Sequence, residues 1–258
     1  MQNLYSRRPI TLLNVDYKIF TKIINDIIKP LLPDIILPSQ NGFVQNRWII
    51  DNIITFNEVA SMAKQSPRYK RSCATLIDFV KAFDSISHSA LLNVLHHFGF
   101  PGRFVSLIKE LLSNSTAKVR VNNFLTEPIS IRRGTKQGDP LSPSLFTILM
   151  ELLNIAINFD ENIAGFEFGQ ANSIKILLFA DDVVLFSQKE KDLELMLKWL
   201  KFFKEATNLV PNRSKCYSIP FNPKDHSCTM YNRVTEKVPA TYLGYVVSPA
   251  GVHNTTDE

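Results

Sequence analysis

The sequence has 258 residues, of which 45% are hydrophobic and 21% charged, a composition typical of globular proteins that excludes wholesale disorder. Lysine and arginine outnumber aspartate and glutamate by 29 to 24, and the net charge of +5 permits a polyanionic partner without requiring one. The three cysteines form no CxxC pair, and the first residues lack the apolar core of a secretory signal. We therefore expect an intracellular protein, in the nucleus or the cytoplasm, without a membrane partner.

The first half of the sequence predicts mainly helices. Apolar residues three and four positions apart indicate helices over 13–31, 51–63, 89–98 and 101–112. Between the second and third of these, a basic loop at 65–72 leads into an apolar run that begins at Cys73 and ends at Asp78. Such a short apolar run ending at a carboxylate predicts a buried strand.

The second half mixes strands and helices. In chain order we first expect paired strands over 117–121 and 128–131, around an Asn122-Asn123 turn, and then a long buried helix over 142–158. Two strands follow over 173–179 and 183–187, joined at Ala180-Asp181-Asp182. A helix over 191–207 and a late strand over 241–248 complete the pattern. Regular βαβ alternation is missing from this pattern. An α+β fold is therefore favoured, with an antiparallel sheet backed by helices.

Two adjacent carboxylates lie between apolar strands in Ile176-Leu-Leu-Phe-Ala-Asp-Asp-Val-Val-Leu-Phe186. Aspartate is unfavourable in strands and costly to desolvate, so either a tight turn keeps the pair in water or the pair has a function. Asp78 ends another apolar strand, and Asp84 follows six residues later. Asp78 and Asp181 on neighbouring strands could bind two divalent cations for phosphoryl transfer, and Mg²⁺ prefers such hard oxygen ligands.

A basic, glycine-containing loop lies between these carboxylates, in Arg132-Arg-Gly-Thr-Lys-Gln-Gly-Asp-Pro-Leu-Ser-Pro-Ser-Leu-Phe146. Gly134 and Gly138 permit close approach of the backbone to a ligand. Lys136 supplies positive charge for phosphates, and Gln137 supplies amide donors and acceptors. The alternative is a loop that only begins the following helix.

These motifs resemble the core of reverse transcriptases, in particular those of non-LTR (LINE-type) retrotransposons. Seven blocks match in the family's order over roughly residues 7–248: Arg8-Pro-Ile-Thr-Leu-Leu-Asn14, Ser39-Gln-Asn-Gly-Phe43 through Asp51-Asn-Ile53, Asp78-Phe-Val-Lys-Ala-Phe-Asp84, Gly134-Thr-Lys-Gln-Gly-Asp-Pro-Leu-Ser-Pro143, Phe179-Ala-Asp-Asp182, Asn208-Leu-Val-Pro-Asn-Arg-Ser-Lys215 and Tyr242-Leu-Gly244. The resemblance implies a right-hand polymerase fold with fingers at 1–72, further fingers strands within 117–133, a palm at 73–250 and a tail at 251–258, and we expect no thumb.

The resemblance also implies an RNA-directed DNA polymerase that adds dNTPs to a primer 3′-OH, with an RNA template and a DNA primer or target as partners. Asp78 and Asp181 would bind two Mg²⁺ ions, with Mn²⁺ as a possible substitute. Asp182 would lie beside them, and the backbone carbonyl of Phe79 would complete the ligand set. Lys215 would protonate the departing pyrophosphate, unless it is a solvated lysine after a turn.

Further roles follow from the same resemblance. Phe83 matches the steric gate that excludes a ribose 2′-OH and so favours DNA synthesis. The resemblance implies that Arg8, Lys136 and Gln137 bind the nucleotide. It also implies that the primer grip consists of Tyr242, Leu243 and Gly244.

The chain departs from the family pattern at two positions and leaves one alternative function open. Asn208 stands where the family often has glycine, and asparagine tolerates the positive φ of such a turn. Pro211 is less usual and would alter the approach of Lys215. The alternative to a polymerase is an inactive, reverse-transcriptase-like RNA-binding remnant or maturase-type module, and the chain could be a partial or degenerate copy.

Overall fold

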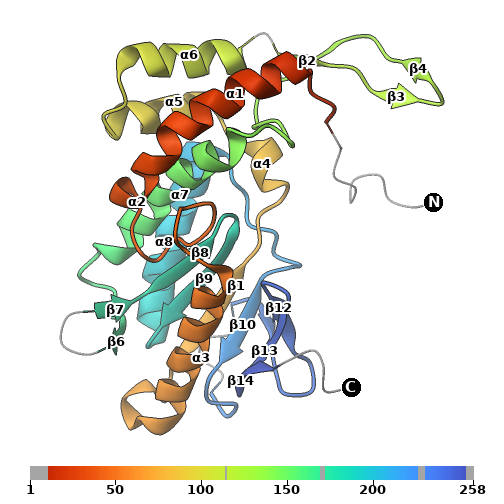
Figure 1. Cartoon of the computed structure of the whole chain (residues 1–258). Helices are drawn as coiled ribbons and strands as arrows, with labels where there is room; N and C mark the ends of the chain where they lie inside the picture. The colour runs from red at the N-terminus through yellow and green to blue at the C-terminus, as the bar shows by residue number, and fades with distance from the viewer. Residues whose placement is uncertain (1–10, 114, 169–171, 226–229, 254–258) are drawn as a thin grey trace.

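A computed structural model describes residues 11–113, 115–168, 172–225 and 230–253. A central sheet crosses the molecule, with helices packed on both of its faces and a smaller sheet beside it (Figure 1). Its strands lie in the order β11 (Asn232–Arg233), β10 (Tyr217–Pro220), β1 (Cys73–Ile77), β9 (Asp182–Ser187) and β8 (Ile176–Phe179). Every neighbouring pair is antiparallel except β10 and β11, so the predicted antiparallel sheet is confirmed.

The predicted helices are all present, with ends shifted by a few residues at most and the long buried helix at 142–158 as expected. They are α1 (Val15–Ile28), α3 (Ile49–Gln65), α5 (His88–His97), α6 (Gly102–Leu112), α7 (Ser142–Asn158) and α8 (Glu190–Thr207). The segment η2 (Lys29–Leu31) continues the first helix within its expected range. Short helical segments that the sequence did not predict are α2 (Leu32–Ile35), η3 (Pro67–Tyr69) and α4 (Ala82–Ser85). No helix in the described part of the chain is long and apolar enough to cross a membrane.

Both faces of the sheet are buried at β1, β8 and most of β9, which explains why these strands are largely apolar rather than alternating. On one face, Ile77, Val183 and Leu185 belong to the cluster that contains the inner sides of α5, α7 and α8. Across the sheet, Leu76 and Phe186 pack with α3 and the small sheet. Every residue of β1 is buried, as the sequence predicted for this strand.

Two predicted strands are divided in the structure. The single strand expected over 241–248 was wrong, because β12 (Ala240–Tyr242) and β13 (Tyr245–Ser248) form a hairpin. Its two turn residues, Leu243 and Gly244, have φ of 49° and 84°, as a two-residue turn requires. Part of the expected tail forms β14 (Gly251–His253), which pairs with β13.

The strand expected over 173–179 is likewise two strands, β7 (Asn172–Ile174) and β8, and β7 pairs with β6 (Phe166–Phe168). The ribbon around Asn122-Asn123 projects from the body (Figure 1). Two short ladders make up this ribbon instead of one: β2 (Thr116–Ala117) with β5 (Ile129–Ser130), and β3 (Arg120–Val121) with β4 (Phe124–Leu125).

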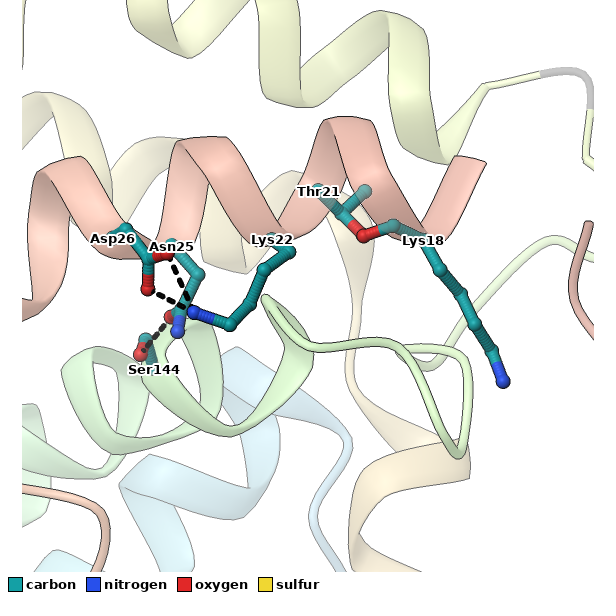
Figure 2. A network of polar contacts seen from close by, with 6 residues as sticks. All are labelled: Lys18, Thr21, Lys22, Asn25, Asp26 and Ser144. Carbon is teal, nitrogen blue, oxygen red and sulfur yellow. Dashed lines mark hydrogen bonds and ion pairs between the residues drawn. The ribbon is translucent and has the colours of Figure 1, made fainter. Parts of the chain in front are cut away.

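Helix α1 is attached to α7 by polar contacts (Figure 2). Ser144 donates its hydroxyl to Asn25 Oδ1 at 2.6 Å, and Lys22 pairs with Asp26 on the same helix. Lys18 extends away from this network, toward the loop that precedes α7. The hydrogen bond between Asn25 and Ser144 therefore joins α1 to the first turn of α7.

Arg47 and Glu151 hold the segment after α2 against α7. The Arg47 guanidinium donates to the carbonyl oxygens of Leu37 at 2.6 Å and Gln40 at 2.7 Å. Glu151, 0% exposed, accepts from the Leu37 backbone N–H and the Asn154 side chain, both at 2.9 Å. Burial raises the pKa of Glu151 from 4.5 to about 7.

The free energy of unfolding should decrease as pH rises through this window. Between the unfolded pKa of 4.5 and the folded pKa of about 7, the folded state binds the proton of Glu151 more often than the unfolded state does. At about 1.4 kcal/mol per pKa unit, the loss is about 3 kcal/mol, and it is complete above the folded value. Urea unfolding at about pH 5 and about pH 8 measures this decrease in the free energy of unfolding. The Glu151→Gln variant should lack this part of the pH dependence of stability. An equal pH dependence in the wild type and the variant would contradict the assignment of the effect to Glu151.

Candidate active site

The strand register brings the three expected carboxylates to one edge of the central sheet. Ile77 on β1 lies opposite Val183 on β9, so Asp78 and Asp182 occupy the next pair of positions along the two strands. Asp181 precedes Asp182 in the β8–β9 turn, where Ala180 has a φ of 56°. Asp78 and Asp181 are half-buried and Asp182 is exposed.

A pocket of about 250 Å³ opens beside this edge. Four residues that the sequence singled out from three separate motifs line it together: Phe83, Lys136, Gln137 and Asp181. The other lining residues are Lys81, Ala82, Gly138, Asp139, Ser142 and Pro143. Lys215 and the Tyr242–Gly244 turn do not line this pocket, and Arg8 lies outside the described residues.

The glycine-containing loop is docked onto α4. Gly134 donates its backbone N–H to the Ile86 carbonyl, and Thr135 donates to the Phe83 carbonyl, both at 2.7 Å. A Cβ at Gly134, whose φ is 83°, would overlap the Asp84 backbone. Glycine is therefore required here by close backbone approach, although to α4 rather than to a ligand.

The side chain of Gln137 has a fixed donor end. Its Nε2 donates to both carboxylate oxygens of Asp84, at 3.2 and 3.0 Å. Because the donor end faces Asp84, the amide oxygen is the group left to accept a hydrogen bond from a ligand.

Lys136 is held between α1 and the start of α7. Its ammonium lies 4.0 Å from the centroid of the Tyr17 ring, and the Tyr17 hydroxyl donates to Asp139 Oδ2 at 3.4 Å. Burial lowers the pKa of Lys136, and the charge of Asp139 opposes that change. Asp139 also accepts from the Leu141 N–H at 3.2 Å, which fits the expectation that this loop begins the long helix. Tyr17 was not identified from the sequence, because its contact with Lys136 joins positions far apart in the chain.

Phe83 is clamped by a second aromatic ring. It stacks on Phe146 of α7, with ring centroids 4.3 Å apart and ring planes at 25°. Phe146 is fully buried, whereas Phe83 is half-buried and reaches the pocket. This stacking restricts the motion of the ring for which the family resemblance implies sugar discrimination.

The block that ends at Lys215 runs beside Asp78. Val80 donates its N–H to the Val210 carbonyl at 2.9 Å, and Asn212 donates to the Asp78 carbonyl at 2.7 Å. Asn208 ends α8 with a φ of 66°, so asparagine does support the turn for which the family often has glycine. Lys215 is exposed, and the structure does not bring its side chain into the pocket.

The donors at this edge fit a hard divalent cation. Carboxylate oxygens of Asp78 and Asp181, with a backbone carbonyl oxygen, are the ligands that Mg²⁺ accepts while water and phosphate oxygens fill its remaining positions. Within the described residues, no group of three or more His, Cys, Asp or Glu side chains gathers to hold a metal by itself.

The turn that carries Asp181 is backed by Gly42. A Cβ at Gly42 would overlap the backbone of Phe179 and Ala180. Gly42→Ala should therefore destabilise the fold by about 2 kcal/mol, since overpacking of this kind costs about 1–3 kcal/mol. Chemical unfolding measures the change, with Gly102→Ala as the control because a Cβ at Gly102 meets nothing within 4 Å. Equal stability of the two variants would contradict the close approach.

Comparisons with known proteins agree with these motifs. The family described as reverse transcriptase (RNA-dependent DNA polymerase) matches residues 3–247. A relative, the "Transposon TX1 uncharacterized 149 kDa protein" of Xenopus laevis, is 31% identical over 81% of this chain. The Drosophila melanogaster "Retrovirus-related Pol polyprotein from type-2 retrotransposable element R2DM" is 31% identical over 70% of it. This chain spans only 16% and 17% of the lengths of these two relatives.

Solved structures show the same fold. The structure of telomerase from Candida tropicalis with a TWJ fragment of telomeric RNA superimposes with a TM-score of 0.66 at 11% identity, over 94% of this chain and 39% of that one. An apo telomerase from the same organism gives 0.63 at 10% identity, over 94% of this chain and 42% of that one. These likenesses confirm the expected α+β fingers-and-palm fold, with an antiparallel sheet backed by helices.

Proposed function

The chain belongs to the reverse transcriptase (RNA-dependent DNA polymerase) family, and its relatives place it among the non-LTR retrotransposon enzymes; we propose that it is an RNA-directed DNA polymerase core. It would add dNTPs to a primer 3′-OH under the direction of an RNA template. The observation that carries this proposal is one pocket that Asp181, Phe83, Lys136 and Gln137 line together. A binding remnant would not need the Asp181 carboxylate in the same pocket as Lys136 and Gln137.

Asp78 and Asp181, with the Phe79 carbonyl, would hold the catalytic ions, and Asp182 would add negative charge beside them. When bound, two divalent cations, which we propose are Mg²⁺, supply activation of the primer 3′-OH and stabilisation of the leaving oxygen. The strand register supports this assignment, since it fixes Asp78 next to the β8–β9 turn. The rigid sheet edge would keep the carboxylates in place during the reaction.

The remaining pocket residues would seat the nucleotide. Lys136 is fixed by the Tyr17 ring and supplies positive charge for the triphosphate. Gln137, oriented by Asp84, would accept a hydrogen bond from a hydroxyl or amino group of the nucleotide. Phe83 would exclude a 2′-OH by steric conflict. Arg8 would contact the triphosphate, since arginine binds phosphates through paired hydrogen bonds.

Two further roles are proposed from the family resemblance. Lys215 would act as the acid that protonates pyrophosphate, because its block runs beside Asp78. Tyr242, Leu243 and Gly244 would grip the primer at the β12–β13 turn. We propose that the fingers comprise 1–72 with strands within 117–133, and that the palm comprises 73–250.

Primer extension tests the proposed function. The 258-residue protein would be incubated with Mg²⁺, dNTPs and a DNA primer annealed to an RNA template. We expect extension by the wild type and none by an Asp181→Ala, Asp182→Ala double variant of equal melting temperature. Equal extension by both proteins would contradict the assignment, and no extension by a folded wild type would contradict polymerase activity of this chain.

A further inference from the structure

A chain of buried amides lies behind the turn that carries the carboxylates. Asn52, on α3, donates from Nδ2 to the Leu178 carbonyl on β8 at 3.2 Å and to the Tyr242 hydroxyl on β12 at 2.9 Å. Its Oδ1 accepts from Asn41 Nδ2 at 2.5 Å. Asn52 is 0% exposed, and Tyr242 is 3% exposed. One side chain therefore joins three segments that are distant in the sequence.

The same turn is held a second time, by the loop at residues 39–42. Gln40 accepts through Oε1 from the backbone N–H of Ala180 at 3.1 Å and from that of Gly42 at 2.8 Å. Asn41 donates its backbone N–H to the Leu178 carbonyl at 2.9 Å. The Leu178 carbonyl thus accepts from two residues, and the backbone up to Ala180 is fixed just before Asp181.

The contact with Tyr242 reaches a different part of the molecule. Tyr242 is the last residue of β12, directly before the Leu243-Gly244 turn. Its ring packs 5.8 Å from that of Phe56, centroid to centroid, so the hydroxyl cannot turn away without disturbing the aromatic cluster. The position of the β12–β13 turn is therefore linked through Asn52 to the backbone of β8.

A buried polar cluster is a weak way to stabilise a fold. Polar groups taken out of water gain little net free energy from their mutual hydrogen bonds, and apolar residues of similar shape are often equally stabilising. Gln40 Nε2, a buried amide nitrogen of the described chain, has no hydrogen-bond partner. The cluster fixes geometry at some expense of stability, which is the property expected of groups that orient an active site.

We propose that Asn52 is a positioning residue that locks the carboxylate turn to the β12–β13 turn, so that the catalytic carboxylates and the primer-gripping turn are held as one unit. This inference rests on the proposed function, because it takes the roles of both turns from there. Asn52 does not line the pocket and would touch neither nucleotide nor cation.

Two substitutions test the link. Asn52→Leu keeps a similar volume and removes all three hydrogen bonds, whereas Tyr242→Phe removes only the hydroxyl. Tyr69→Phe is the matched control, because Tyr69 is 4% exposed in the same aromatic cluster and lies away from the carboxylates. Binding of Mn²⁺, followed by the electron paramagnetic resonance signal of the free ion, reports on the carboxylates without any need for catalysis.

We expect Asn52→Leu to weaken Mn²⁺ binding and to lower kcat by roughly 10- to 100-fold, as is typical when groups that orient metal ligands are removed. The KM for dNTP should stay unchanged. Tyr242→Phe should have a smaller effect of about fivefold, the size expected for one hydrogen bond. Tyr69→Phe should bind Mn²⁺ like the wild type. Because Asn52 and Tyr242 act through one contact, the double variant should lose no more than Asn52→Leu alone.

The outcomes separate this inference from the proposed function. If both variants melt at lower temperature but bind Mn²⁺ with wild-type affinity, Asn52 is an ordinary core residue and the inference is wrong. Additive losses in the double variant would also overturn the link. If Asn52→Leu fails to fold, the comparison of Tyr242→Phe with Tyr69→Phe decides. A wild type that binds no Mn²⁺ would overturn the proposed metal site and this inference together, while binding without primer extension would count against the proposed function alone.

Discussion

Asp78→Asn should lower the rate of nucleotide addition by roughly 1,000-fold, because a divalent cation stabilises developing charge by several kcal/mol and each 1.4 kcal/mol is a factor of ten in rate. Asparagine keeps the size of the side chain and removes its negative charge. Asp78 is half-buried at the end of β1, and the Asp78 carbonyl still accepts from Asn212 in the variant. Single-turnover primer extension at saturating dNTP measures the chemical step.

Asp34→Asn is the control for this loss of charge. Asp34 is exposed on α2 and does not line the pocket, so its variant should extend primers at the wild-type rate. Raising the Mg²⁺ concentration should restore part of the activity of Asp78→Asn if weakened ion binding is the cause. An Asp78→Asn protein that retains activity within about fivefold of the wild type would show that Asp78 is not a ligand, since such a change is smaller than the loss of one orienting group.

The six long helices were predictable because each has a strong local signal, whereas the short segments α2, η3 and α4 were not predicted. α7 spans residues 142–158 as expected, since a mainly apolar run begins after Asp139-Pro-Leu-Ser-Pro and contains no glycine or further proline that would end the helix. The hairpin at β12–β13 was missed because both turn residues, Leu243 and Gly244, lie within an apolar segment. A Leu in the left-handed region is unusual, and the sequence gives no reason to expect it.

Some residues of the candidate site could likewise be predicted from local patterns, and others could not. Asp181 and Gln137 stood out because a carboxylate pair between apolar strands and a basic glycine loop are unusual locally. Their meeting in one pocket was expected only from the family resemblance, because the contacts that build it join distant segments. Tyr17 was missed because it is an ordinary residue of a helix whose partner lies far along the chain. Asn52 lies at the end of a matched block, but the sequence assigned it no role, because its contact with Tyr242 joins distant segments. Sequence patterns therefore identify residues with reactive or ligand-binding side chains more readily than the residues that position those side chains.

Phe83→Val should reduce the discrimination against ribonucleotides by on the order of 100-fold, the range over which a change in pocket size alters substrate preference. The Phe83 ring reaches the pocket and is stacked on Phe146 at 4.3 Å, so it cannot easily move aside for a 2′-OH. Valine opens that space while keeping an apolar side chain. The ratio of kcat/KM for dCTP to that for CTP, in primer extension opposite a template guanine, measures the change.

Phe100→Val separates sugar discrimination from a general loosening of the core. Phe100 is half-buried and stacks on Phe104, with centroids 5.2 Å apart and the same 25° between ring planes, but it does not line the pocket. Both variants lose one stacked ring, so a similar loss of stability is expected. Only Phe83→Val should change the dCTP/CTP ratio. An unchanged ratio in Phe83→Val, or an equal change in Phe100→Val, would contradict the assignment of Phe83 as the gate, since a steric gate acts on the sugar and not on the fold.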